Sequence, residues 1–66
     1  MFSVRNRLRE LRARDNLTQA QLAAALDVSR QTIHAVESGK YDPSLPLAFK
    51  ISALFQLPLE QIFSPD

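Results

Sequence analysis

The chain has 66 residues, a formal net charge of +1 and no cysteine. This length allows a single domain, placed at residues 1–66, and the missing cysteines exclude disulfides and thiolate metal sites. The sequence holds neither the apolar run of a signal peptide nor the roughly 20 apolar residues that span a bilayer. We therefore expect a soluble, cytoplasmic protein that does not enter membranes.

The charge is unevenly distributed along the chain. Residues 1–14 hold five arginines and one glutamate, a net charge of +4, whereas residues 15–66 have a net charge of −3. A basic segment beside a mildly acidic body favours an anionic partner approached from one side. An arginine-rich helix that is simply solvated would produce the same pattern.

Helical spacing of apolar residues predicts two helices in the first half of the chain. The first runs from about Val4 to Arg14, with an inward stripe of Val4, Leu8 and Leu11. The second begins after Thr18, an N-cap that suits a capping box with Gln21, and ends at Leu26.

A third helix follows after a tight turn at Asp27 and Val28. Ser29 caps it, its predicted range is about 29–38, and Gly39 ends it. Ile33 and Val36 are expected to face the core. Two short helices joined in this way present the second helix to the DNA major groove.

Two further helices complete the prediction. Ser44 caps the fourth, Pro46 lies in its first turn, and its expected apolar face is Leu47, Ala48, Ile51, Leu54 and Phe55. A break at Leu57 and Pro58 precedes a short fifth helix, from Leu59 to about Phe63. No alternating pattern is long enough to predict a strand, beyond a possible pairing of Phe2–Ser3 with the chain near Ser64.

The start of the third helix carries side chains that can recognise bases. Arginine can bind guanine and glutamine can bind adenine through two hydrogen bonds, each pair discriminating by roughly 1–3 kcal/mol. We predict base contacts from Arg30, Gln31, His34 and Ala35. Arg30 could instead contact phosphate alone, and His34 could face solvent or the DNA backbone.

These residues and their spacing resemble the lambda-repressor/Cro-like, or XRE-type, helix-turn-helix family. The matching positions are Thr18, Gln19, Leu22, Ala23, Val28, Ser29, Ile33, Glu37 and Gly39. The segments Leu8–Arg12, Asp42–Leu45 and Pro58–Phe63 are also similar, so the resemblance covers almost the whole chain. It implies an all-α, compact five-helix DNA-binding domain with the helix-turn-helix at its second and third helices.

The resemblance also implies contacts to the DNA backbone. Gln19 opens the second helix, where its amide and the free backbone N–H groups can bind a phosphate, although it could be an ordinary exposed residue. The loop after the third helix commonly lies on the sugar-phosphate backbone in this family. The full predicted set is Gln19, Ser29, Thr32, Lys40, Tyr41 and Ser44, with Arg5 or Arg9 as a more distant contact.

Glu37 stands at the end of the third helix, where a carboxylate opposes the helix dipole and requires a compensating partner. The resemblance implies a structural ion pair between Arg12 and Glu37, behind the recognition helix. A bidentate contact would hold that helix against the first one. The alternative is that Arg12 reaches phosphate and Glu37 is solvated.

The chain departs from the family pattern at three positions. Asp27 stands where the turn usually has glycine, so a modestly strained backbone is expected there. Pro46 and Phe49 alter the fourth helix and its packing. We expect no attached effector domain, because the sequence stops at Asp66.

The end of the chain is unusually apolar, with five apolar residues among the seven from Leu57 to Phe63. A short helix cannot bury this many beneath itself, so we expect a two-fold dimer interface. Its predicted residues are Asp42, Leu57, Leu59 and Ile62, with Leu59 at the centre. We also expect Ile62 and Phe63 to complete the monomer core.

Together these features predict a sequence-specific, homodimeric transcriptional regulator that binds double-stranded DNA, and more specifically a repressor on a palindromic operator. An activator, an antitoxin of a toxin–antitoxin pair and a protein–protein adaptor are the alternatives. An enzyme is not expected, because the chain has one histidine, no cysteine and no glycine-rich loop. The sequence also predicts no cofactor, metal or small-molecule ligand.

Overall fold

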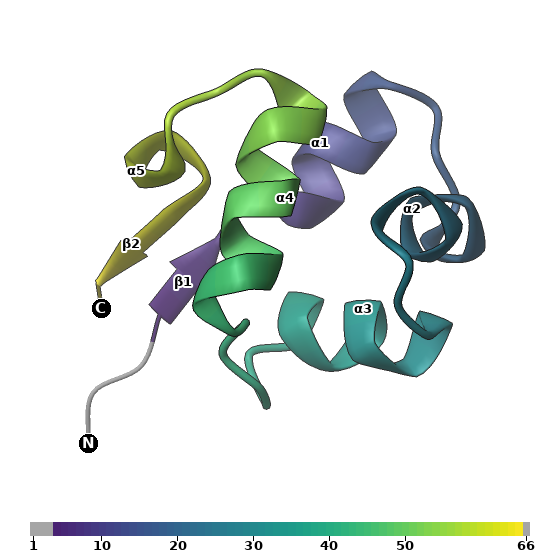
Figure 1. The fold of residues 1–66 in the computed structure, drawn as a ribbon, viewed down its shortest axis with the longest axis horizontal. Helices are drawn as coiled ribbons and strands as arrows, with labels where there is room; N and C mark the ends of the chain where they lie inside the picture. Colours follow the sequence, from purple (N-terminus) through teal and green to yellow (C-terminus); the bar gives the residue numbers. More distant parts are fainter. Residues whose placement is uncertain (1–3, 66) are drawn as a thin grey trace.

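The computed structural model describes residues 4–65 and contains five helices within that range. They are α1 (Leu8–Arg14), α2 (Gln19–Leu26), α3 (Arg30–Glu37), α4 (Leu45–Phe55) and α5 (Leu59–Ile62). Figure 1 shows α4 upright in the middle, with α2 on one side, α5 on the other and α3 lying sideways below α2. The all-α, five-helix architecture is as predicted, and no helix in residues 4–65 is long and apolar enough to cross a membrane.

A two-stranded antiparallel sheet joins the ends of the described chain, and the sequence did not predict it. Strand β1 (Val4–Asn6) pairs with β2 (Phe63–Pro65), with Arg5 opposite Ser64. The prediction of a helix from Val4 and of no strand was therefore wrong, because three-residue strands are too short to show an alternating pattern. The suggested pairing of Phe2–Ser3 lies outside the described residues.

Side-chain caps start the central helices where the sequence predicted them. Thr18 Oγ1 accepts from the Gln21 backbone N–H at 3.0 Å, while Gln21 Oε1 accepts from the Thr18 N–H at 2.9 Å, which completes the capping box. Ser29 Oγ caps α3 through the Thr32 N–H at 3.1 Å, and Ser44 Oγ caps α4. The boundaries of α2, α3 and α4 are therefore determined locally.

The turn between α2 and α3 passes through a left-handed residue. Asp27 has a φ of 59°, a conformation that costs an L-residue roughly 1–2 kcal/mol. Asn16 and Gln56 adopt the same conformation after α1 and α4, with φ values of 57° and 56°. Gly39 ends α3 with a φ of 81°, which glycine adopts without strain.

The core lies between the four longer helices and is completed by one residue of α5. It consists of Leu8, Leu11, Leu22, Ala23, Leu26, Ile33, Val36, Leu47, Ile51, Phe55 and Ile62. Leu54 was predicted to belong to it but is 39% exposed. It lies two turns beyond the buried Leu47 on nearly the same side of α4, where it lines a shallow groove with Ala25 and Leu26 instead.

Candidate nucleic-acid interface

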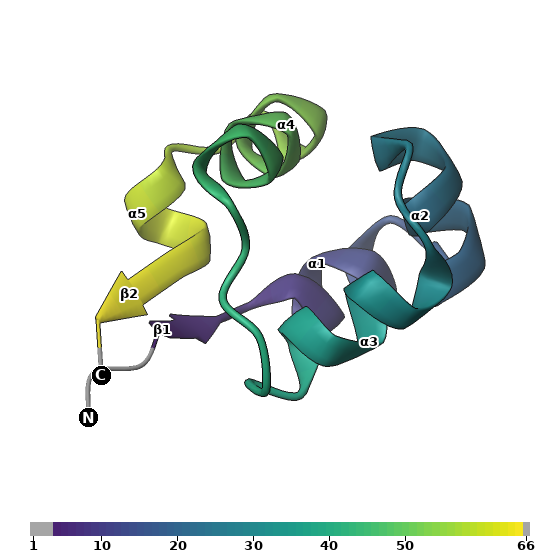
Figure 2. The same cartoon turned by 60° about the horizontal axis from the view of Figure 1, so that its bottom comes forward.

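Helix α3 has one buried face and one exposed face. Ile33 and Val36 point into the core with 0% and 1% exposure, whereas Arg30, Gln31 and His34 are exposed. Figure 2 shows α2 and α3 joined by a short turn, with α3 at the edge of the molecule away from α4. The opening turn of α3 therefore projects outward, as recognition of a groove requires.

The hydroxyl groups at the start of α3 are already hydrogen bonded to each other. Ser29 Oγ and Thr32 Oγ1 lie 2.9 Å apart, and Ser29 Oγ also accepts from the Thr32 backbone N–H. Ser29 is exposed, whereas Thr32 and the predicted base-contact residue Ala35 are half-buried. The capping role of Ser29 is thus present in the structure, and its contact with DNA stays a prediction.

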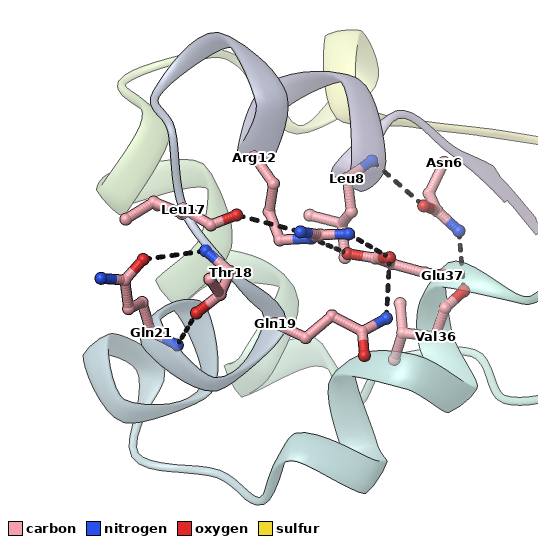
Figure 3. Close-up of polar contacts among 9 residues, drawn as sticks. All are labelled: Asn6, Leu8, Arg12, Leu17, Thr18, Gln19, Gln21, Val36 and Glu37. Atoms are coloured by element: carbon pink, nitrogen blue, oxygen red, sulfur yellow. Dashed lines mark hydrogen bonds and ion pairs between the residues drawn. The ribbon is translucent and has the colours of Figure 1, made fainter.

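Behind α3, Arg12 and Glu37 form the bidentate ion pair that the family resemblance implies (Figure 3). Arg12 Nε donates to Glu37 Oε2 at 2.5 Å, and Arg12 Nη2 donates to Glu37 Oε1 at 3.1 Å. Arg12 Nη1 also donates to the carbonyl of Leu17 at 2.9 Å. The Glu37 side chain is 1% exposed, so the contact is shielded from water and lies between α1 and α3.

Gln19 has a role that sequence reasoning missed. Its Nε2 donates to Glu37 Oε1 at 3.2 Å, which links the start of α2 to the same carboxylate (Figure 3). An amide nitrogen carries two N–H groups, so the second remains available for a phosphate. No local signal indicates this bond, because its partners lie 18 residues apart.

The contacts of Glu37 with Arg12 and Gln19 determine its ionisation. Burial opposes the charged form, but hydrogen bonds from Arg12 and Gln19 outweigh it and keep the pKa of Glu37 below its ordinary value. The same carboxylate raises the pKa of Arg12. Glu37 is therefore a buried anion at neutral pH and holds α1, α2 and α3 together.

Asn6 is a second positioning residue that the sequence analysis did not identify. Its Oδ1 accepts from the Leu8 N–H at 3.1 Å, and its Nδ2 donates to the Val36 carbonyl at 2.8 Å (Figure 3). One side chain thereby contacts the first residue of α1 and the last turn of α3. The sequence predicted a continuous helix over residues 4–14. In the structure Asn6 lies in β1, before α1 begins, so its contacts were not expected.

The residues after α3 that are predicted to contact the DNA backbone follow a helix end whose last carbonyls are hydrogen bonded. The Gly39 and Lys40 N–H groups donate to carbonyls of α3 at 3.1 Å, so the chain turns sharply there. Lys40, Tyr41 and Ser44 are exposed beyond this turn, and Tyr41 is 46% exposed. Ser44 Oγ accepts a capping hydrogen bond but can still donate its own hydrogen.

The arginines near the N-terminus divide into paired and unpaired residues within residues 4–65. Arg7 contacts Glu10 and the Gln61 carbonyl, and Arg14 contacts Asp15. Arg5 and Arg9 are exposed and form no ion pair with the described residues. These two are therefore the arginines of β1 and α1 that remain available to an anion.

The structure changes the expected dimer interface at one residue. Ile62 is 1% exposed and belongs to the core of the monomer, so its side chain is not presented to a second subunit. The core role that was also expected for Ile62 is therefore present, and the interface itself stays a prediction. Asp42 is exposed, whereas Leu57 and Leu59 are half-buried.

The fold and its exposed α3 define a helix-turn-helix DNA-binding domain. The helix-turn-helix family model matches residues 8–62, and the chain belongs to this family, in its lambda-repressor-like or XRE-type branch. It is a DNA-binding transcriptional regulator, and its family is not enzymatic.

The similar proteins agree with this assignment. The HTH-type transcriptional regulator MJ0272 of Methanocaldococcus jannaschii is 58% identical over 60 residues, 91% of each chain. The HTH-type transcriptional activator BcrR of Enterococcus faecalis is 41% identical over 91% of this chain, which spans 29% of that protein. A crystal structure from Bacteroides fragilis, of a candidate DNA-binding protein, has a TM-score of 0.80 at 28% identity and covers 92% of this chain and 98% of its own.

Proposed function

We propose that this regulator is a homodimeric repressor that places the start of α3 in the major groove of a palindromic operator. The observation that carries the proposal is the orientation of α3. Ile33 and Val36 on its core face are buried, its polar first turn is exposed, and a buried ion pair holds it against α1. Repression needs only occupancy of the operator, which this module can supply.

The proposed base contacts come from Arg30, Gln31, His34 and Ala35. Arg30 and Gln31 have the side chains best suited to guanine and adenine, and both are exposed at the first turn of α3. Ala35 is half-buried and can present only its methyl group to a thymine methyl.

The proposed backbone contacts surround α3. Their residues are Gln19, Ser29, Thr32, Lys40, Tyr41 and Ser44. Gln19 opens α2 and is held beside α3 through Glu37, while the other residues lie at the start of α3 or follow its end. Contacts on both sides of a recognition helix would set its register on the duplex.

Random-site selection with the purified protein tests this function directly. We expect an enriched palindrome whose half-sites are about one helical turn, roughly 34 Å, apart. The Gln31→Ala variant should lose preference at one base position per half-site, at a cost of roughly 1–3 kcal/mol. Enrichment of no sequence above background would contradict sequence-specific binding.

Activation is a second candidate, favoured by the similarity to the activator BcrR. A reporter gene carrying the selected palindrome separates the two roles. Expression that falls when the regulator is supplied supports repression, and expression that rises supports activation. In either role we propose that the protein acts in the cytoplasm as a homodimer, with Asp42, Leu57 and Leu59 at the subunit interface.

A further inference from the structure

Helix α4 exposes two large apolar side chains that the core does not explain. Leu45 is 61% exposed and Phe49 is 57% exposed, whereas the core residues Leu47, Ile51 and Phe55 of the same helix are at most 6% exposed. Leu45 and Phe49 are four residues apart, so they are neighbours on one face of the helix. We call this pair the α4 stripe.

The stripe is separate from the other apolar surface of α4. Leu54 comes nine residues after Leu45, about 180° around the helix, and faces the groove beside the end of α2. Lys50, the only charged residue of α4, lies about 140° around from Leu45. The stripe can therefore be covered without burying a charge of its own helix.

We propose that a second copy of this chain covers the α4 stripe, so that α4 packs beside α4 of the partner across the dimer axis. This inference rests on the proposed function, in which two copies bind one palindrome. A symmetric interface presents the same patch from both copies and suits a stripe along a single helix.

The arrangement of the helices determines how the two copies would meet. In Figure 1, α4 stands upright and α3 lies to one side below it, and Ile33 and Val36 of α3 are buried in the core. Two α3 helices that face the same DNA require a dimer axis that points from the protein toward that DNA. With the stripe beside this axis, the two α4 helices would meet each other, and each stripe residue would lie near its own counterpart.

The exposed area of the stripe suits a small, stable interface. A leucine and a phenylalanine that are each about half exposed present together on the order of 200 Å² of apolar surface. Four such side chains supply about 400 Å², which matches the apolar centre of an interface near the lower limit of about 1,200 Å² in total. Leu57 and Leu59 are half-buried in their own protomer and would lie at its periphery.

The chain has no cysteine, so single-cysteine variants can test the contact in the full-length protein. Residues beside a two-fold axis lie close enough to their counterparts for a disulfide, which needs Cα atoms within about 7 Å. We expect Leu45→Cys or Phe49→Cys to form covalent dimers under mild oxidation at least tenfold faster than Leu54→Cys, the control on the opposite side of α4.

Leu59→Cys tests, in the same experiment, whether the interface is centred on Leu59 of α5 instead of on the α4 stripe. Covalent dimers from Leu59→Cys alone would overturn the proposal. It would also be overturned if the two stripe positions, Leu45 and Phe49, crosslinked no faster than the control position Leu54.

A charge placed in the stripe gives a second test. Phe49→Glu should sediment as a monomer at concentrations where the wild type is a dimer, with little change in thermal unfolding because Phe49 is exposed. It should bind a single half-site as the wild type does and the palindrome at least tenfold more weakly, while Phe49→Leu should remain a dimer.

The outcomes separate this inference from the proposed function. A Phe49→Glu protein that stays dimeric overturns the α4 contact and leaves the dimeric repressor intact. A wild-type protein that is monomeric both free and on the palindrome overturns both.

Discussion

At the scale of single residues, Gln19 has one observed role and one proposed role. Its amide nitrogen donates one hydrogen bond to Glu37 and retains a second N–H for a phosphate. Because the contact to DNA would be neutral, its loss should weaken binding without changing the salt dependence. Lys40, by contrast, is a proposed backbone contact that carries a charge.

We expect Gln19→Ala to weaken binding to all DNA sequences alike, by about 0.5–1.5 kcal/mol, the usual value of one hydrogen bond. Titration of the selected palindrome and of a scrambled duplex at several salt concentrations measures this. Lys40→Ala should instead reduce the salt slope by about one. Gln61→Ala, an exposed glutamine of α5, is the matched control, and a change in base preference for Gln19→Ala would contradict the assigned role.

Backbone conformation at two helix ends gives a second prediction at this scale. Gln56 has a φ of 56° and Gly39 a φ of 81°, both in the left-handed region. Gln56→Gly should raise the free energy of unfolding by about 0.5–1 kcal/mol, and Gly39→Ala should lower it by about 1 kcal/mol. Nothing lies within 4 Å of the position of an added Cβ at Gly39, so its cost would be conformational. Urea unfolding measures the change in the free energy of unfolding for each variant. If both variants were stabilised, or both destabilised, this explanation would be contradicted.

At the scale of the elements, the buried carboxylate of Glu37 joins three helices. Arg12 comes from α1, Gln19 from α2 and Glu37 itself from the end of α3. Asn6 adds a bond from β1 to the Val36 carbonyl of α3. The recognition helix is thus oriented by polar contacts as well as by its apolar face.

The lowered pKa of Glu37 predicts a pH dependence of stability. Because its pKa is below the ordinary 4.5 in the folded protein, its contribution is complete above about pH 4.5 and is lost as pH falls through the folded pKa. Glu37→Gln should lower the free energy of unfolding at pH 7 by about 2–3 kcal/mol, since Arg12 loses its partner. The difference from the wild type should narrow in urea unfolding at pH 3. Glu60→Gln, a control at an exposed residue, should change the free energy of unfolding little at either pH. If the stability difference between Glu37→Gln and the wild type were the same at pH 7 and pH 3, ionisation of Glu37 would not be its cause.

At the scale of the whole molecule, one copy of α3 offers few contacts, and a second copy doubles them. The Leu59→Glu variant tests the place of Leu59 in the proposed interface. We expect it to shift the dimer toward monomer in sedimentation, and less than Phe49→Glu does, because Leu59 lies at the periphery of the proposed interface and a charge there is only partly desolvated. Glu60→Gln, beside it in α5, should leave the equilibrium unchanged. A Leu59→Glu dimer of wild-type strength would remove Leu59 from the interface.

The helix-turn-helix was predictable from the sequence because its signals are local. The Thr18–Gln21 capping box, the Ser29 cap and the Gly39 stop each act within one turn of helix. The apolar spacing of Ile33 and Val36 also determines which side of α3 remains exposed. Family resemblance added the pairing of Arg12 with Glu37, which spacing alone does not reveal.

The remaining features depend on residues that are distant in the sequence. Strand β1 forms only because Phe63–Pro65 returns beside it, and the bonds of Gln19 to Glu37 and of Asn6 to Val36 span 18 and 30 residues. The exposure of Leu45, Phe49 and Leu54 was likewise decided by which helices reach α4. The sequence by itself determined α2, α3 and α4, the caps that start them and the exposed face of α3, because these follow from local spacing and capping. Only the tertiary structure decided the sheet, the polar contacts behind α3 and the uncovered face of α4, because each requires segments that meet only after the chain has folded.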